Sequence, residues 1–228
     1  DVVALCDTNA ERAQSVAGQA GVSRVTTRFA DVLVMPDVDV VDLCTPPGLH
    51  YQQILDVLAA GKHCICEKPL VGSLRAVDEL IAAERQACKR VMPIFQYRFG
   101  AGPQRLRFLR ERGLTGQPYV ATVEMHWRRR ADYYATAWRG KWATDLGGLL
   151  NGLTVHMLDV VMDVLGPVRR AAAFLDTKVN PIEVDDCASA MMEMANGALV
   201  TVSATLGSAT QITRQRFVFA NLVAESDT

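Results

Sequence analysis

Residues 38–69 read VDVVDLCTPPGLHYQQILDVLAAGKHCICEKP, and this stretch decides the fold. Two apolar runs, 38–44 and 63–66, are typical of buried strands, and the segment between them has apolar side chains at helical spacing before Gly61. A strand, a helix and a strand joined by short links predict two parallel strands with a right-handed crossover. Ligands of such sheets bind at the carboxyl ends of the strands, here at residues 45–47 and 67–69.

The same alternation extends in both directions along the chain. Upstream we expect a strand over residues 1–6, then a helix and a short strand over 25–29. Downstream we expect a helix over 74–88 and a strand over 90–97. Residues 1–98 are therefore predicted to form an α/β domain with a Rossmann-like parallel sheet.

The pattern changes after about residue 100. Helical periodicity over 102–112 and 149–165 alternates with strand-like runs, which are 119–128, 168–175, 186–194, 198–206 and 213–220. Asn196-Gly197 between two of these runs favours a two-residue hairpin. We predict that residues 99–228 form an α+β domain with a mixed or antiparallel open sheet and a helix on one face.

Composition excludes several classes of protein. The chain has 228 residues and a net charge of −1, so it has no overall positive electrostatic field that would bind nucleic acid. No run approaches the roughly 18 consecutive apolar residues of a membrane span. Three of the six cysteines lie in apolar strand-like runs and none has zinc or redox spacing, so we expect reduced thiols in a cytoplasmic protein.

Asp7 follows the first apolar run. A carboxylate at this position can accept hydrogen bonds from both hydroxyl groups of an adenosine ribose. Alternatively, it lies near the N-terminus of the next helix and is stabilised there by the helix dipole. No Gly-x-Gly-x-x-Gly occurs in the sequence. If Asp7 binds ribose, we expect a further strand and a glycine-rich turn about 20 residues upstream, so that the printed chain begins inside its domain.

Glu67-Lys68-Pro69 is the sharpest local feature, because packing does not explain a charged pair between a buried strand and a proline. Lys68 could exchange a proton with a hydroxyl group that is oxidised to a carbonyl group. The competing interpretation is a solvated turn with an incidental ion pair. Thr45-Pro46-Pro47 forms a comparable shelf after the preceding strand, or a simple strand-to-helix turn that places His50 in the first helical turn.

His156 lies in the apolar helix predicted over 149–165, on one stripe with Gly152, Asp159 and Asp163. Asp159 is spaced to orient the imidazole group of His156, although a histidine in such a helix can also be a core residue with satisfied hydrogen bonds. No second histidine stands at metal-ligand spacing, and we expect no metal site.

All three tryptophans fall within residues 127–142, where they alternate with arginine, lysine and tyrosine. Such a mixture suits stacking on a sugar ring and hydrogen bonds to hydroxyl or carboxylate groups, and it also suits a packed segment between domains. The candidate substrate contacts are Trp127, Tyr134, Trp138 and Arg139.

In their order and spacing, these residues resemble the Gfo/Idh/MocA oxidoreductase family over essentially the whole chain. The resemblance rests on Cys6-Asp7, Thr45-Pro46-Pro47-x-x-His50, Glu67-Lys68-Pro69, Gly147-Gly148 and His156-x-x-Asp159. It implies an NAD(P)-binding Rossmann domain, truncated here at its start, followed by an α/β domain whose open sheet makes dimers or tetramers. It also implies that Lys68 is the catalytic lysine and His156 the substrate-side histidine.

The resemblance further implies that the cofactor is lined by Asp7, Thr45, Pro46, His50, Glu67 and Lys68. Two departures from the family pattern stand out. Gly152 occupies the position where many members have an aspartate four residues before the histidine, and Gly147-Gly148 provides two glycines where many members have three. A three-residue acid–base relay is therefore in doubt.

We predict hydride transfer between a nicotinamide and a C–OH group of a sugar, sugar acid or polyol, with Lys68 as acid or base and with His156 and Asp159 on the substrate side. Asp7 favours NAD over NADP, because a 2′-phosphate would meet a like charge. Two alternatives remain, an NAD-dependent glycosidase and a non-catalytic protein that senses nucleotides or sugars. The expected partners are a small sugar or polyol and further copies of the chain, without nucleic acid or membrane.

Overall fold

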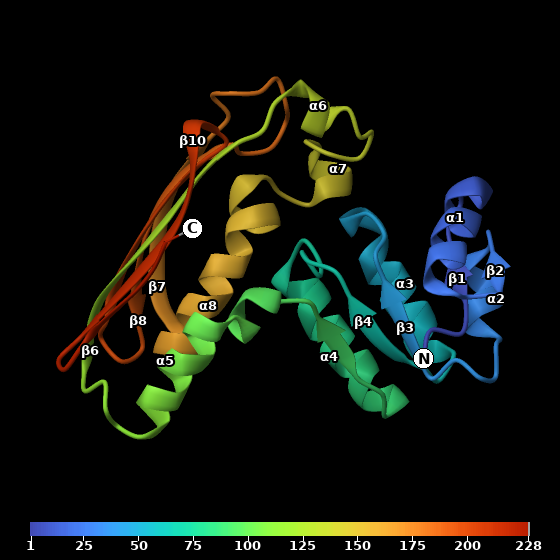
Figure 1. The fold of residues 1–228 in the computed structure, drawn as a ribbon, viewed down its shortest axis with the longest axis horizontal. Helices are drawn as coiled ribbons and strands as arrows, with labels where there is room; N and C mark the ends of the chain where they lie inside the picture. The colour runs from blue at the N-terminus through green and yellow to red at the C-terminus, as the bar shows by residue number, and fades with distance from the viewer. Residues whose placement is uncertain (228) are drawn as a thin grey trace. The chain divides into compact units, whose positions relative to one another are not determined.

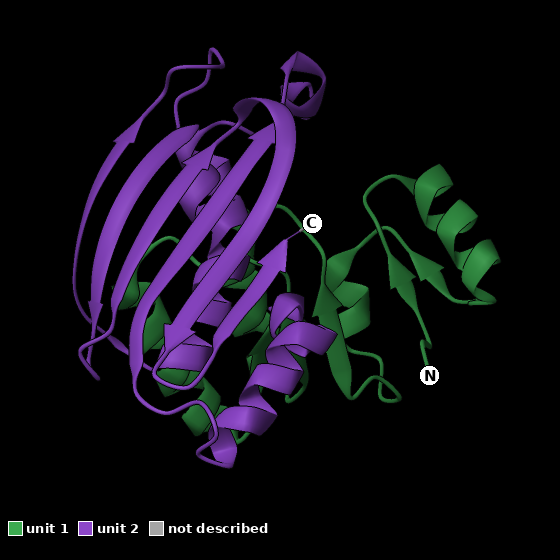
Figure 2. Cartoon of the chain, turned by 60° about the vertical axis from the view of Figure 1, so that its left-hand side comes forward, with its two compact units in different colours: residues 1–94 green, residues 95–228 purple. Residues whose placement is uncertain are grey.

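The computed structural model describes residues 1–227, which divide into two compact units (Figure 2). Unit 1 is Asp1–Ile94, and unit 2 begins at Phe95. The boundary lies slightly before residue 98, where the sequence placed it. Each unit has a hydrophobic core of its own, and each is therefore described by itself.

Unit 1 alternates strands and helices, as the sequence predicts (Figure 1). Its strands are β1 (Leu5–Cys6), β2 (Val25–Thr26), β3 (Val40–Leu43), β4 (His63–Cys66) and β5 (Val91–Pro93). Its helices are α1 (Ala10–Ala20), α2 (Phe29–Leu33), α3 (Pro47–Ala59) and α4 (Leu74–Ala87). Every strand pair in this unit is parallel, which confirms the Rossmann-like sheet.

The strands of unit 1 form two separate parallel sheets, β1–β2 and β3–β4–β5. The expected single sheet is therefore not continuous over the described residues, because β1 pairs only with β2 and β3 pairs only with β4. The further upstream strand expected from the sequence stays a prediction. The core of the larger sheet is built by α3, whose Ile54 and Val57 are fully buried together with Cys66 of β4.

Several strands of unit 1 are shorter than the sequence predicted, and the strand expected over 1–6 comprises only Leu5–Cys6. The strand expected over 25–29 ends at Thr26, and α2 begins at Phe29. The strand expected over 90–97 ends at Pro93, and the backbone N–H of Ile94 makes one more bond, to the carbonyl oxygen of Cys66 at 2.9 Å. A 3₁₀ turn, η1 (Gln96–Phe99), follows it at the start of unit 2.

Unit 2 contains a mixed sheet in the order β11–β10–β6–β9–β8–β7, which confirms the predicted architecture. The strands are β6 (Pro118–Arg128), β7 (Val168–Asp176), β8 (Cys187–Met194), β9 (Leu199–Thr205), β10 (Gly207–Phe219) and β11 (Val223–Asp227). Only β6 and β9 pair in parallel. The Asn196-Gly197 hairpin is confirmed between β8 and β9, with Gly197 at a φ of 88°.

Helices cover one face of this sheet (Figure 1). They are α5 (Ala101–Glu111) and α8 (Val155–Leu165), with a π-helical turn η2 (Leu150–Thr154) leading into α8. The short helices α6 (Ala131–Tyr134) and α7 (Trp142–Asp145) lie in the connection between β6 and η2, beyond one end of the sheet (Figure 1). Alternate residues of β6, such as Val123 and Met125, are buried in one core with Met157 and Val161 of α8.

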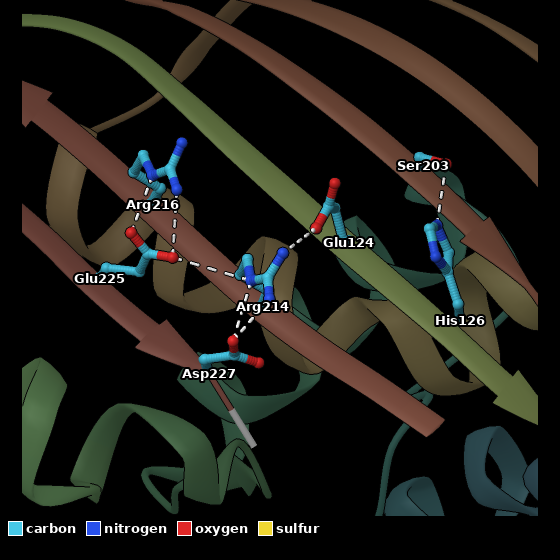
Figure 3. Close-up of polar contacts among 7 residues, drawn as sticks. All are labelled: Glu124, His126, Ser203, Arg214, Arg216, Glu225 and Asp227. Carbon is cyan, nitrogen blue, oxygen red and sulfur yellow. Dashed lines mark hydrogen bonds and ion pairs between the residues drawn. The ribbon is translucent and has the colours of Figure 1, made fainter. Parts of the chain in front are cut away.

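The other face of the sheet is uncovered within unit 2 and carries a charged network (Figure 3). Arg214 of β10 contacts Glu124 of β6 and Asp227 of β11, and Arg216 pairs with Glu225. Large apolar side chains stand on the same sheet, with Phe174 of β7 84% exposed.

One stretch of the described residues, Trp142–Leu165, is long and apolar enough to cross a membrane by length and composition. Half of the most apolar part of this stretch is buried inside the protein, and the core helix of a globular domain meets the same criterion. Its burial against β6 accounts for its apolar character without a bilayer.

The cysteines are less uniformly buried than the sequence suggested. Cys64 and Cys66 of β4 are buried, but Cys6 and Cys44 lie exposed near their strand ends. All six thiols are free. Burial raises the pKa of the Cys64 thiol to about 12, so that it stays protonated at neutral pH.

Candidate functional site

Asp7 stands directly after β1, where the sequence placed a ribose-binding acid. Its carboxylate accepts hydrogen bonds from Arg12 at 2.6 and 2.7 Å and from the backbone N–H of Asn9 at 2.8 Å. These contacts, the Arg12 side chain first, hold the pKa of Asp7 below its usual range, so the group is an anion at neutral pH. The guanidinium partner five residues downstream was not predicted.

The Thr45-Pro46-Pro47 shelf begins α3. Pro46 is the residue before the helix and Pro47 is its first residue, a position that proline tolerates because the first helical N–H has no partner. The Thr45 hydroxyl group donates to Gln53 Oε1 at 2.5 Å. This bond fixes the side chain at the carboxyl end of β3.

His50 was expected to line the cofactor, and this role stays a prediction. The side chain is completely buried, with Nδ1 2.9 Å from the carbonyl oxygen of Pro69 and Nε2 2.8 Å from that of Thr45. Both ring nitrogens are thus occupied by the backbone. The His50 side chain thus lies between the residues that follow β3 and β4 and contacts the backbone of both the Thr45-Pro46-Pro47 shelf and the Glu67-Lys68-Pro69 turn.

Glu67 and Lys68 follow β4 and are half-buried. The backbone N–H of Glu67 donates to Leu43 of β3 at 2.9 Å, which extends the parallel pairing by one residue. The Lys68–Pro69 peptide bond is cis. Because β4 ends at Cys66, Lys68 stands at the carboxyl edge of the sheet, where parallel sheets bind ligands.

In unit 2, His156 is the second residue of α8 and is 6% exposed. The ring of Tyr97 from η1 stacks on its imidazole group, with ring centroids 4.8 Å apart and planes inclined by 20°. Phe95 meets the same ring edge-on, at 6.2 Å and 80°. Two aromatic rings therefore limit the orientations that the imidazole group can take.

Asp159 was predicted to orient His156, but its carboxylate is engaged by another residue. Arg98 of η1 donates to both carboxylate oxygens, with Nε 2.8 Å from Oδ2. The next acid on the stripe, Asp163, accepts from Arg107 of α5 at 2.6 Å. The acidic stripe of α8 thus anchors η1 and α5, and a direct role of Asp159 toward the imidazole group stays a prediction.

The Gly147-Gly148 turn is fixed by an acid that the sequence analysis missed. Asp185 accepts from the backbone N–H of Gly148 at 3.0 Å and of Leu150 at 2.9 Å. A Cβ atom on Gly148 would lie 2.0 Å from the backbone oxygen of Asp185, so only glycine fits. This carboxylate satisfies the first N–H groups of the helical segment that carries His156.

The aromatic segment places its predicted substrate residues in different surroundings. The Trp127 indole donates to Thr213 at 2.8 Å, and Trp127 and Tyr134 both pack against the unit 2 core. Trp138 and Arg139 are half-buried, with the Arg139 guanidinium carbon 5.0 Å from the Trp138 ring centroid and 3.9 Å from that of Tyr133.

A pocket of 430 Å³ lies elsewhere in unit 2, between η1, α5, α8 and the strands β10 and β11. It is mostly apolar, with Leu106, Met157 and Phe217 in its wall, and Tyr97 lines it as well. None of the four predicted substrate residues, all of which the structure describes, lines this pocket. Within residues 1–227, no group of three or more His, Cys, Asp or Glu side chains could hold a metal ion.

Comparison with known proteins identifies the family of both units. Residues 1–95 match the oxidoreductase family with an NAD-binding Rossmann fold, and residues 104–220 match the GFO/IDH/MocA C-terminal domain. The chain is 33% identical to D-glucoside 3-dehydrogenase of Escherichia coli over 168 residues, which are 73% of this chain and 47% of that enzyme. It is 32% identical to 1,5-anhydro-D-fructose reductase of Ensifer adhaerens, over 72% of this chain and 49% of the enzyme.

Among solved structures, the WlbA dehydrogenase of Bordetella pertussis in complex with NADH and UDP-GlcNAcA superimposes with a TM-score of 0.93 at 29% identity. The superposition covers all of this chain and 66% of the other. The chain thus spans about half the length of the two curated relatives and less than two thirds of the WlbA structure. Since family matches extend over both of its units, the chain belongs to the Gfo/Idh/MocA family of oxidoreductases.

Proposed function

We propose that the protein is an NAD-dependent oxidoreductase that transfers a hydride between the nicotinamide and a C–OH group of a sugar, sugar acid or polyol. Two observations carry this proposal: both units match the family, and Glu67-Lys68-Pro69 stands at the carboxyl edge of the parallel strands. Two relatives of similar sequence are named for reactions on sugars, a glucoside dehydrogenase and an anhydrofructose reductase. Their names support a carbohydrate substrate.

The residues of unit 1 fit the ribose end of NAD. Asp7, directly after β1, is ionised, and 25% of its side chain is exposed. Its carboxylate can therefore accept hydrogen bonds from ribose hydroxyl groups. Thr45 and Pro46 would border the cofactor at the next strand end, and Glu67 and Lys68 would border it at β4. NAD is favoured over NADP because the Asp7 carboxylate would repel a 2′-phosphate, although Arg12 lies beside it.

Side chains of the protein would transfer the hydroxyl proton of the substrate and orient its reacting oxygen. Lys68 takes the hydroxyl proton when the substrate is oxidised and returns it in the reverse direction. His156, held by Tyr97, donates to or accepts from the reacting oxygen and fixes the sugar. Asp159 supports this arrangement through its two bonds to Arg98, which tie η1 to α8.

We also propose that copies of the protein associate through the uncovered face of the unit 2 sheet. Arg214 and Arg216 form cross-strand ion pairs on that face, and exposed apolar side chains such as Phe174 and Met191 stand on the sheet. The expected states are a dimer or a tetramer.

Six free thiols support a reducing, cytoplasmic location.

The test is a turnover screen of the full-length protein with NAD and a panel of sugars, sugar acids and polyols. Lys68→Ala should lower turnover by about 100-fold or more while NADH binding persists, because general acid–base catalysis contributes about that much. Lys89→Ala, on a residue outside the strand ends, is the control. Unchanged turnover in Lys68→Ala would remove the lysine from the reaction, and glycoside cleavage without net cofactor reduction would point to a glycosidase.

A further inference from the structure

Positive charge is concentrated in one short segment of unit 2. The chain has a net charge of −1, yet residues 127–142 carry one acidic residue, Asp132, and five basic ones, which are Arg128, Arg129, Arg130, Arg139 and Lys141. The same segment holds all three tryptophans and two tyrosines. Such a bias of charge and aromatic surface is typical of a site that recognises an anion.

Two guanidinium groups of this segment meet at one aromatic ring. The guanidinium carbon of Arg139 lies 3.9 Å from the ring centroid of Tyr133, and that of Arg129 lies 5.3 Å from the same centroid. Arg129 also lies 4.8 Å from the ring centroid of Trp127. We call Arg129, Tyr133 and Arg139 the guanidinium cluster. Cations that share one ring repel each other unless an anion stands near them.

Within the described residues, the arginines of the guanidinium cluster have no direct carboxylate partner, although Asp145 contributes negative charge near Tyr133. Arg129 donates to the backbone oxygen of Arg128, and no ion pair joins either arginine of the cluster to an acid. Elsewhere in unit 2, comparable arginines have carboxylate partners, as Arg98 and Arg107 do. The contrast indicates that the anion of the cluster is not supplied by these parts of the chain.

The Nε group of Arg139 provides a second, independent observation. It is buried and donates to no acceptor among residues 1–227. A buried N–H group without an acceptor is unfavourable, so native proteins satisfy almost all of them with protein, water or ligand atoms. Together with the missing carboxylate, this N–H group points to an acceptor that comes from outside the described chain.

The guanidinium cluster is tied to the helical segment that carries His156. Gly140, next to Arg139, accepts from the backbone N–H of Glu183 at 2.9 Å, and Glu183 accepts from the backbone N–H of Trp142 at 3.1 Å. The same loop ends at Asp185, which binds the Gly148 turn before α8. Residues 183–185 therefore contact both the segment that holds the cluster and the start of the histidine-bearing segment.

We infer that the guanidinium cluster binds an anionic group of the substrate, so that the protein acts on sugars that bear a carboxylate or a phosphoester. Guanidinium groups bind both of these anions through paired, charge-assisted hydrogen bonds, and the neighbouring aromatic faces suit a sugar ring. This inference rests on the proposed function and adds a substrate class to it. Cation–π packing alone would give the same contacts without any preference for anions.

The test compares matched sugars in the full-length protein. D-Glucuronate, D-glucose 6-phosphate and UDP-glucose are measured against D-glucose, both for turnover with NAD and for binding to the NADH complex by calorimetry. The first sugar carries its charge as a carboxylate and the other two carry phosphoesters, so the arms separate the two sources of the anion. We expect at least one charged sugar to exceed D-glucose by about 10-fold or more in binding and in kcat/KM.

Substitutions then assign the preference to the cluster. Arg139→Gln should lower kcat/KM for the preferred anionic sugar by about 10- to 100-fold and that for a neutral sugar by less than about 3-fold. Arg139→Lys should recover only part of the loss, because an ammonium group lacks the paired geometry. Arg130→Gln, on an exposed arginine outside the cluster, is the control, and thermal unfolding of each variant checks its fold.

The outcomes separate this inference from the proposed function. Equal binding of charged and neutral sugars, or an equal loss for both in Arg139→Gln, would overturn the anion subsite even if turnover occurs. Binding of a charged sugar that depends on Arg139, without turnover of any sugar, would retain the subsite and refute the oxidoreductase. If Arg139→Gln fails to fold, the comparison of sugars on the wild-type protein and on Arg139→Lys still decides the matter.

Discussion

A methyl group added at Gly148 should separate the turn before α8 from the loop that anchors it. The added Cβ atom would lie 2.0 Å from the backbone oxygen of Asp185 and 2.6 Å from its backbone nitrogen. Both are backbone atoms that cannot rotate away, so the loop must retreat by about 1 Å or more. That retreat would break the bonds from Gly148 and Leu150 to the Asp185 carboxylate and the bond from Leu149 to its backbone oxygen.

The size of the effect follows from the bonds that are lost. Hydrogen bonds to a charged group contribute about 1.5–3 kcal/mol each, so losing the two carboxylate bonds alone should cost about 3–6 kcal/mol. This is a large share of the roughly 5–15 kcal/mol that stabilises a domain. Gly148→Ala should therefore lower the free energy of unfolding by at least about 3 kcal/mol, and it should displace His156 together with its helical segment.

Urea unfolding of Gly148→Ala and Gly102→Ala measures this difference directly. Gly102 lies in the first turn of α5, and a Cβ atom there would meet nothing within 4 Å. Its replacement should leave the protein as stable as the wild type or more stable, by up to about 1 kcal/mol. A loss smaller than about 1 kcal/mol in Gly148→Ala would refute the argument that this turn is fixed by close contact with Asp185.

Three further outcomes are expected. Tyr97→Leu should lower turnover by up to about 10-fold and remove the ring-current shift from the His156 resonances. Tyr97→Phe should preserve the turnover and the ring-current shift, because the stacked ring remains. Equal effects in the two variants would exclude stacking as the cause. Asp7→Ser should shift the preference from NAD toward NADP by about 10-fold or more, because the freed Arg12 can pair with a phosphate, and an unchanged ratio of kcat/KM values would contradict the ribose assignment. The two cysteines of β4 should react with iodoacetamide at neutral pH at least about 10-fold more slowly than exposed Cys88, because burial raises their pKa and reduces the thiolate fraction. Mass spectrometry of the labelled peptides measures the rates, and comparable rates would contradict this expectation.

Local patterns predicted most of the elements that depend on neighbouring residues. The strand over 63–66 has the bounds expected from its apolar run, and the Asn196-Gly197 turn joins its two strands because both patterns act over a few residues. The helix predicted over 149–165 is present, but its first part is a π-helical turn. Periodicity indicates an apolar face and does not distinguish these two helical geometries.

Contacts between distant parts of the chain were beyond the reach of sequence patterns. The bond from Arg98 to Asp159 and the stack of Tyr97 on His156 join residues about sixty positions apart. Tyr97 was also assigned to the end of a strand over 90–97, because Pro93 was not recognised as the last residue of that strand. The sequence signal that could have indicated the end of this strand was Pro93, followed by Tyr97-Arg98 before the predicted helix.

Two site residues illustrate which contacts a motif does not reveal. His50 belongs to the motif that identified the family, yet its ring is buried and bonded to two backbone oxygen atoms. A histidine after a strand end reads the same in sequence whether it faces a ligand or braces the loop. Asp185, in contrast, has no motif around it, and its role depends on a glycine that lies 37 positions earlier in the chain.

Isotope transfer tests the central claim most directly. The full-length protein is incubated with NAD and a fully deuterated sugar that it accepts, and the reduced nicotinamide is analysed by mass spectrometry. Direct hydride transfer from carbon predicts one deuterium atom in each reduced nicotinamide, and Lys68→Ala should form the same labelled product far more slowly. Reduced nicotinamide without deuterium, or no reduction with any sugar, sugar acid or polyol while NADH binds, would contradict the account.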